Sequence, residues 1–282
     1  MTRDVFSRPP GRRPERLSRR ALLGLGWPAR ARADIDYDSV SERVKAGWER
    51  EGHEPWLRAI EPAAEVLVEL ADIGPGARVL DAAAGDGNVT RAALARGAEI
   101  DACDFAREMT ARGQARCPEA RWQIGDVQAL PYSDGEFDAV LSTFGAVLAP
   151  RARRTANELV RVVKPGGVVG LTAWVPRGLP GRLDELVVLP DGVRSPADWG
   201  VQAVVQERLE LLLEGLALRT RTVQLRFDDA DAFFAALVRP HALDLDEVRP
   251  WLEQLLASCN NAPPPRVEID ARYLVAIGRR AA

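Results

Sequence analysis

The sequence predicts a doubly wound α/β fold, in which helices cover both faces of a mostly parallel sheet. Short, almost continuously apolar strands alternate with helical stretches between residues 77 and 175, the pattern of strands that are buried on both faces. A glycine-rich turn follows the first of these strands and opens a helix. The composition agrees, because 282 residues of which 46% are hydrophobic and 28% charged can bury a substantial core.

The first segment of the chain is strongly basic. Residues 1–33 contain nine arginines against Asp4 and Glu15, a local net charge of +7, so the remaining residues sum to about −10. Their proline, glycine and arginine content predicts a disordered tail. The acidic remainder argues against nucleic-acid binding. Residues 18–23 resemble a twin-arginine export signal, but the apolar stretch that follows is short, so we expect a cytoplasmic protein.

Two helices are predicted before the sheet, over residues 34–73, which we expect to form an N-terminal helical cap. Val40, Val44 and Trp48 recur at helical spacing in the first. The second follows Pro55 and ends at Gly74-Pro75-Gly76. No apolar run approaches the length of about 18 residues that spans a bilayer, so stable membrane insertion is not expected.

The central part of the chain alternates between strands and helices. Strands are predicted at 77–82, 99–103, 121–124, 137–142 and 168–175, with helices at 89–96, 107–116 and 151–163. Lys164-Pro165-Gly166-Gly167 is typical of a type II turn, because proline fixes φ at its second position and glycine allows a positive φ at its third.

The last hundred residues are less regular. A stretch rich in proline and glycine, 176–200, precedes a predicted helix over 201–213 and a half-buried strand over 218–227. Residues 229–258 are predicted as two helices broken at Pro240, and 267–278 as the final strand. The segment 229–262 is therefore a helical insertion before that strand.

The turn after the first predicted strand has the residues best suited to bind a ligand. Asp81 ends the first strand, and Gly85 and Gly87 follow it in a turn that lets a ligand approach the backbone without a Cβ in the way. The helix that begins near Asn88 directs unpaired N–H groups at the same place, which suits a carboxylate.

Two further carboxylates follow the next two strands. Asp104 ends the second strand, at the offset where an acid accepts hydrogen bonds from ribose hydroxyls in doubly wound sheets. Asp126 ends the third, where it could accept a bond from an adenine amino group. The carboxyl ends of parallel strands meet at one edge, so the three carboxylates are predicted to line one crevice.

Five ordered motifs resemble those of class I S-adenosylmethionine-dependent methyltransferases, in particular the branch of small-molecule and ubiquinone/menaquinone-type enzymes. They cover about residues 65–175 and are the Asp81–Asn88 segment, Cys103-Asp104-Phe105, Gly125–Tyr132, Phe137–Gly145 and Lys164–Gly167. The resemblance implies a Rossmann-like seven-stranded sheet whose last strand is antiparallel. It also implies a methyltransferase domain over 74–282 in which 229–262 forms part of the acceptor pocket.

The resemblance implies S-adenosyl-L-methionine as cofactor and a small molecule as methyl acceptor, by in-line displacement at O, N or C. Asp81 and the turn would hold the methionine end, Asp104 the ribose, Phe105, Asp126 and Val127 the adenine, and Thr143 the methionine moiety. The family usually has glycine where this chain has Ala83, so we expect Ala83 to keep a negative φ. The implied cofactor-binding residues are Asp81, Ala83, Gly85, Asp86, Gly87, Asn88, Asp104, Phe105, Asp126, Val127 and Thr143.

Alternatives remain open at this stage. A nicotinamide-dependent oxidoreductase also uses Gly-x-Gly, but a third glycine is missing at Thr90, and Asp81 has no role there. A non-enzymatic S-adenosylmethionine-binding regulator would need the same cofactor residues. No catalytic residue follows from the sequence, since neither His53 nor His241 has a partner motif. The histidines and cysteines have no metal-ligand spacing, and neither the acceptor nor the oligomeric state is indicated.

Overall fold

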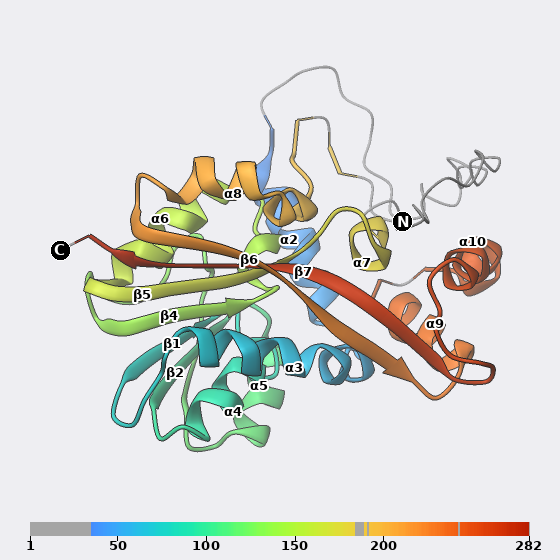
Figure 1. Cartoon of the computed structure of the whole chain (residues 1–282), viewed down its shortest axis with the longest axis horizontal. Helices are drawn as coiled ribbons and strands as arrows, with labels where there is room; N and C mark the ends of the chain where they lie inside the picture. Colours follow the sequence, from blue (N-terminus) through green and yellow to red (C-terminus); the bar gives the residue numbers. More distant parts are fainter. Residues whose placement is uncertain (1–34, 184–188, 191, 242, 282) are drawn as a thin grey trace, which may run out of the picture.

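The computed structural model describes residues 35–183, 189–190, 192–241 and 243–281. The basic segment 1–33 lies outside the described residues. Seven strands form one sheet of order β3-β2-β1-β4-β5-β7-β6 (Figure 1), in which β7 runs antiparallel to both of its neighbours. The strands are β1 (Arg78–Ala82), β2 (Glu99–Asp104), β3 (Arg121–Ile124), β4 (Phe137–Thr143), β5 (Val163–Trp174), β6 (Leu213–Phe227) and β7 (Val267–Arg280). The predicted doubly wound sheet with an antiparallel last strand is confirmed.

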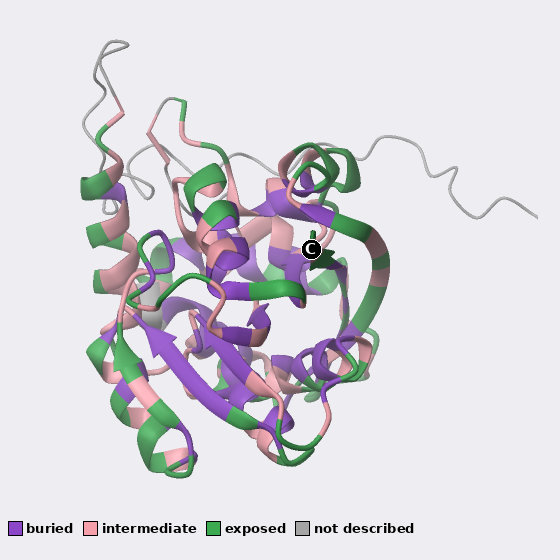
Figure 2. Ribbon diagram, turned by 90° about the vertical axis from the view of Figure 1, so that its left-hand side faces the viewer, coloured by how far each residue is buried: buried purple, intermediate pink, exposed green. Residues whose placement is uncertain are grey.

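Helices cover both faces of this sheet, and the strands between them are buried (Figure 2). One face packs against α3, α4 and α5, and the other against α6 and α8, while α9 and α10 pack beside the far end of the β6–β7 pair. The helices are α2 (Tyr37–Trp48), α3 (Glu54–Leu70), α4 (Asn88–Leu94), α5 (Arg107–Arg116), α6 (Ala152–Val162), α7 (Leu179–Arg182), α8 (Gln202–Leu209), α9 (Ala230–His241) and α10 (Leu245–Ala257), with 3-10 turns η1 (Ala146–Leu148) and η3 (Pro196–Gly200).

Local chemistry explains where the first helices begin. The Asp36 carboxylate accepts the Ser39 N–H at 3.0 Å and so caps α2. Pro55 occupies the first turn of α3, where its missing N–H is not needed. The apolar side of α3 includes Leu57, Ile60 and Leu67, all buried in the core.

Three predicted boundaries are wrong. The helix expected over 201–213 ends at Leu209, because β6 already begins at Leu213. The break expected at Pro240 comes later, since α9 continues to His241 and α10 begins at Leu245. Strand β5 begins at Val163, which pairs with Phe137 ahead of the predicted turn, and the register then shifts between Phe137 and Ala139.

The register of the parallel strands sets the position of the crevice. Asp81 pairs with Ala102 across β1 and β2, and Asp104 pairs with Ile124 across β2 and β3. The carboxyl ends of these strands therefore lie side by side at one edge of the sheet, where ligands bind in open α/β folds. None of the described helices is long and apolar enough to cross a lipid bilayer.

Candidate functional site

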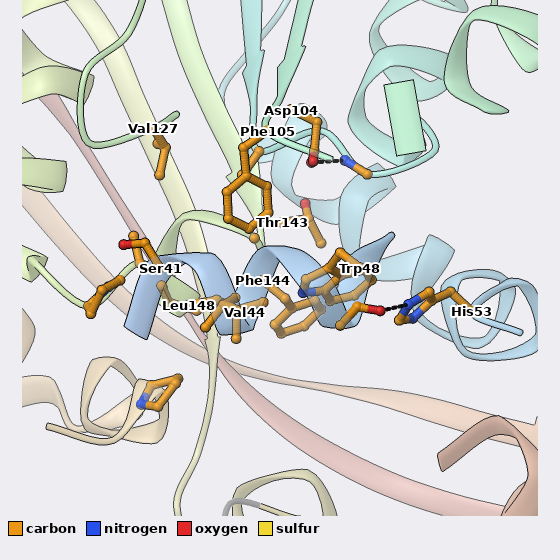
Figure 3. A pocket seen from close by; sticks show the side chains of 18 of the residues that line it. Ser41, Val44, Trp48, His53, Asp104, Phe105, Val127, Thr143, Phe144 and Leu148 are labelled. Atoms are coloured by element: carbon orange, nitrogen blue, oxygen red, sulfur yellow. Dashed lines mark hydrogen bonds between the residues drawn. The ribbon is translucent and has the colours of Figure 1, made fainter. Parts of the chain in front are cut away.

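A cavity of about 370 Å³ opens at this edge. The ends of β1, β2 and β4 form its floor, and α2 crosses over it (Figure 3). In Figure 3, Asp104, Phe105 and Thr143 lie on one side of the cavity, while α2 passes across it with Ser41, Val44 and Trp48. Helices α3 and α9 also contribute lining residues.

Asp81 lies at the bottom of the cavity and is almost fully buried. Its Oδ2 accepts two hydrogen bonds from Thr90, one from the backbone N–H at 2.9 Å and one from the hydroxyl at 2.8 Å. Its other oxygen, Oδ1, has no hydrogen-bond partner among the described residues. Burial raises the pKa of Asp81 to about 7, since a charged carboxylate is costly away from water. The side chain is thus held in place by one oxygen and leaves the other for a ligand.

The turn after Asp81 corrects one expectation. Ala83 has a φ of +55°, so the prediction of a negative φ is wrong. A left-handed conformation costs a residue with a Cβ about 1–2 kcal/mol, and here it is imposed by close packing. The chain at Gly145 passes so near that a Cβ there would lie 2.3 Å from the Ala83 carbonyl oxygen. Both residues line the cavity.

Asp104 ties the turn to the second strand. Its Oδ2 accepts the Gly85 N–H at 2.8 Å, and its Oδ1 accepts the Ala106 N–H at 2.9 Å. Each carboxylate oxygen can accept a further bond, so the side chain retains capacity for a ligand. Burial raises the pKa of Asp104 to about 6. Figure 3 shows the bond between Asp104 and the turn, with the Phe105 ring directed into the cavity.

Asp126 is more exposed than the other two carboxylates and belongs to a tight turn after β3. Its Oδ1 accepts the Gln128 N–H at 2.8 Å, and its Oδ2 accepts the Gln128 side-chain amide at 3.0 Å. Val127 is buried between them and lines the cavity. The three predicted carboxylates therefore meet at one cavity, as their positions at the strand ends imply.

Thr143 also lines the cavity, at the end of β4. Its hydroxyl oxygen is buried and has no hydrogen-bond partner among the described residues. A buried hydroxyl without a partner is costly, so this atom favours a polar ligand group beside it. The next residue, Phe144, has a φ of +60° and stacks on Trp174 with ring centroids 3.8 Å apart.

Of the other predicted residues of the turn, one lines the cavity and two pack behind the turn. Asn88 lines the cavity, donates to the Leu57 carbonyl at 2.9 Å and accepts from Arg116 at 2.8 Å. Asp86 and Gly87 are not among the lining residues. Asp86 lies 3.1 Å from the Arg116 guanidinium, and Gly87 packs close to the Trp122 ring.

Sequence reasoning missed the residues that fasten α2 over the cavity. Glu49 accepts the backbone N–H groups of Arg107 and Glu108 at 2.9 and 3.0 Å, which caps the start of α5. In the N-terminal half of α2, Ser41 accepts a bond from Gln128 at 3.0 Å. These partners lie 58 or more positions apart in the chain. Nothing in the local sequence indicates that a polar residue next to one helix caps another helix.

The far end of the cavity is mainly aromatic and aliphatic. Its walls come from α3, β4, β5, the segment after α7 and the region of α9, and they include Trp56, Phe144, Trp174, Leu183, Leu189, Pro190, Val193, Ala236, Leu237 and Leu243. Of the aromatics that precede or follow the motifs, Trp199 is buried away from the cavity, where Arg208 lies over its ring at 4.4 Å.

His53 lines the cavity behind Trp48. Its ring stacks on Trp48 with centroids 4.3 Å apart, and its Nε2 lies 3.1 Å from the Gly47 carbonyl oxygen. A carbonyl can only accept, so Nε2 carries a proton. Burial lowers the pKa of His53, which keeps the ring neutral at pH 7. The side chain of His241 lies outside the described part of the chain, and no cluster among the described residues has the ligands for a metal ion.

Comparisons with known proteins agree with this geometry. Residues 79–167 match the model of the methyltransferase-domain family. An uncharacterized protein of Mycobacterium tuberculosis is 41% identical over 155 residues, which cover 52% of this chain and 57% of that protein. The demethylmenaquinone methyltransferase of Beutenbergia cavernae is 34% identical over 131 residues, which cover 46% of this chain and 50% of that enzyme. The chain thus spans about half the length of the curated relatives it matches.

Solved structures share the fold at low sequence identity. The YcgJ protein from Bacillus subtilis superposes with a TM-score of 0.54 at 19% identity, covering 78% of this chain and 99% of that one. Identity at this level supports the same chain topology and carries no information about the acceptor.

Proposed function

Residues 79–167 form a class I S-adenosylmethionine-dependent methyltransferase domain, and from this premise we propose that the protein methylates a small-molecule acceptor. The observation that carries the proposal is the meeting of Asp81, Asp104 and Asp126 with the unpartnered Thr143 hydroxyl at one cavity. Two of these carboxylates, Asp81 and Asp104, are buried, and no cationic side chain among the residues that the structure describes contacts them. A ligand that brings positive charge and hydrogen-bond donors would compensate that burial.

S-adenosyl-L-methionine fits these groups. The free Oδ1 of Asp81 would accept from its α-ammonium group, and Asp104 would accept from the ribose hydroxyls. Asp126 would accept from the adenine amino group, while the Val127 N–H would donate to an adenine ring nitrogen and Phe105 would pack beside the base. Thr143, Ala83, Gly85 and Asn88 would border the methionine moiety, and Asp86 and Gly87 would shape the turn from behind.

For methyl transfer, the protein mainly has to align the acceptor with the methyl group of the cofactor. When bound, S-adenosyl-L-methionine supplies a methyl group already activated by a sulfonium charge. The carboxylates of Asp81 and Asp126 would hold the two ends of the cofactor and Asp104 its ribose, and the Phe144–Trp174 stack would separate the adjoining space from water. Holding the acceptor at about 3–3.5 Å in line with the methyl group accounts for most of the rate enhancement that such a site can provide.

The lining of the far end supports an acceptor with a substantial apolar part. Trp56, Trp174, Leu237 and Leu243 offer aromatic and aliphatic surface that is stabilised by covering it with an apolar group, while Arg43, Arg50 and Arg194 are the arginines that line the cavity. We propose that α9, within the insertion 229–262, and the cap 34–73 together form this acceptor pocket. The name of the demethylmenaquinone methyltransferase relatives agrees with an apolar acceptor.

No residue at the cavity is assigned as a catalytic base. His53 is neutral, and no hydrogen bond within the described part of the chain involves its Nδ1, but its ring is stacked on Trp48 at the edge of the cavity. An acceptor that is already a good nucleophile needs no proton removed before attack. A phenol or an alcohol would need one, and identification of the product decides between these cases.

The test has two stages. Isothermal titration with S-adenosylhomocysteine is expected to show one site on the purified protein, and NADH is expected to show none. Tritiated S-adenosyl-L-methionine is then incubated with the protein and a metabolite extract, and the label is followed into the organic-solvent fraction. Binding of NADH in place of S-adenosylhomocysteine would overturn the proposal. Cofactor binding without transfer to any fraction would identify a regulator instead of an enzyme.

A further inference from the structure

Gln128 is a buried amide between the cofactor side of the cavity and α2. Its side chain is only 3% exposed, and each of its polar atoms has a partner. The Nε2 group donates to the Asp126 carboxylate at 3.0 Å and to the Ser41 hydroxyl at 3.0 Å. The Oε1 atom accepts the Arg151 N–H at 3.0 Å, at the start of α6. The Gln128 amide therefore connects three elements, which are the turn after β3, helix α2 and the start of α6.

The side chain and the backbone of Gln128 hold Asp126 in different ways. The Gln128 N–H bonds Asp126 Oδ1, and the Ala129 N–H bonds the Asp126 carbonyl, so the turn itself does not depend on the amide. The amide lies 3.0 Å from Oδ2 and 3.3 Å from Oδ1, so it adds a second restraint on the rotation of the carboxylate about its terminal bond. Removing the amide leaves the turn and the backbone bond to Oδ1 in place and loosens the hold on Oδ2.

Helix α2 is held over the cavity by contacts along its length: Val40 is buried, Trp48 stacks on the His53 ring, and the Gly47 carbonyl oxygen lies 3.1 Å from His53 Nε2. Glu49 caps α5 at one end, and in the N-terminal half Ser41 bonds Gln128 while Asp38 pairs with Arg151 at 2.9 Å. Between them Val44 and Trp48 face the cavity. Single polar contacts of this kind contribute about 0.5–1.5 kcal/mol each, so the bond from Gln128 to Ser41 is one of several that hold α2 in place.

We propose that Gln128 is a positioning residue that presents the Asp126 carboxylate to the adenine amino group and makes this presentation depend on the docking of α2 through Ser41. The inference rests on the proposed function, because it assumes an adenosyl ligand in the cavity. Recognition of the adenine and closure of α2 are then one coupled event. A ligand whose purine lacks the amino group gains less from Asp126 and draws α2 onto the cavity less strongly.

The test compares S-adenosylhomocysteine with S-inosylhomocysteine, which carries oxygen in place of the adenine amino group. Dissociation constants are measured by titration calorimetry for the wild type and for Gln128→Glu, Gln128→Met, Ser41→Ala and Ser39→Ala. Gln128→Glu retains the acceptor for Arg151 and loses both donated bonds. Ser39 is the matched control, because it also lies on α2 but its hydroxyl bonds Asp36 at 2.6 Å. Thermal unfolding confirms that each variant is folded.

We expect the wild type to prefer S-adenosylhomocysteine at least tenfold, since a hydrogen bond to a charged group is among the stronger ones. Both Gln128 variants are expected to lower this preference to threefold or less, and Ser41→Ala to an intermediate value, with Ser39→Ala unchanged. In hydrogen exchange, S-adenosylhomocysteine should protect residues 37–48 of the wild type, and this protection should fall in the Gln128 and Ser41 variants.

A purely structural role would weaken both ligands equally and leave the preference as in the wild type, which would overturn the inference. A wild type that binds both ligands equally would overturn it too, with the proposed function intact. A wild type that binds neither ligand would contradict the proposed function itself. The two failures are therefore distinguishable.

Discussion

Cofactor affinity should rise with pH between 6 and 7.5, because a buried carboxyl must lose its proton before it can pair with an ammonium group. The pKa of Asp81 is raised by burial to about 7, so the ligand-free site holds a proton that the ligand displaces. With that pKa the ionised fraction is about 9% at pH 6 and about 76% at pH 7.5, an increase of about eightfold. The pKa of Asp104, about 6, adds about twofold over the same interval.

The assay is titration with S-adenosylhomocysteine in two buffers of different ionisation enthalpy, at pH 6 and pH 7.5. The wild type should bind about sixteenfold more tightly at the higher pH and release protons on binding at the lower one. In Asp81→Asn the amide oxygen can still accept from Thr90, but the titrating group is gone. The pH effect should then shrink to about twofold, with weaker binding throughout.

Asp138→Asn is the control, since Asp138 lies at the opposite end of β4 and is paired with Lys164 at 2.7 Å. Its pKa is lowered by that hydrogen bond, so it stays ionised over the whole interval, and the variant should reproduce the wild-type pH effect. An affinity that does not change between pH 6 and pH 7.5, or a full pH effect in Asp81→Asn, would refute the assignment of Asp81 to the ammonium group.

Three further outcomes are expected. Ala83→Gly should raise the free energy of unfolding in urea by about 0.5–1 kcal/mol, since relief of the left-handed strain exceeds the entropy that glycine adds to the unfolded chain. The control Ala82→Gly, in the buried strand, should lower the free energy of unfolding. Asp104→Ala should weaken S-adenosylhomocysteine by about 1–3 kcal/mol in calorimetry, and an unchanged affinity would remove the ribose assignment. Leu237→Trp should raise the KM for the acceptor several-fold without altering cofactor affinity, and a loss of cofactor affinity would contradict an acceptor pocket beside α9.

The sheet and its acidic edge could be predicted because both follow from local pattern. Apolar runs of strand length fix the strands, and parallel pairing then brings the residue after each strand to a common edge. The sequence therefore predicted that one crevice holds Asp81, Asp104 and Asp126. It did not predict which groups hydrogen-bond to these carboxylates. Helix ends were less predictable, as at Leu213, where a leucine-rich stretch suits either a helix or a strand until a partner strand is present.

The contacts that fasten α2 could not be predicted for a different reason. Ser41 and Gln128 lie 87 positions apart, and nothing in either neighbourhood distinguishes a residue that bonds across the fold from one that bonds water. Only pairing in three dimensions supplies this information.

Ala83 is the most informative error, because the strain it reveals is concentrated at the cavity. Among the described residues, non-glycine positive φ values occur at Asp72, Ala83 and Phe144, and the last two line the cavity at the ends of the adjacent strands β1 and β4. Such conformations persist only where the surrounding structure enforces them. Here Gly145 packs on the Ala83 carbonyl, and Phe144 is held by its stack on Trp174 and by its N–H bond to the Thr172 hydroxyl at 3.1 Å. The positive φ values at these two strand ends therefore mark a backbone path that the packing beside the cavity enforces, whether alanine or glycine occupies position 83.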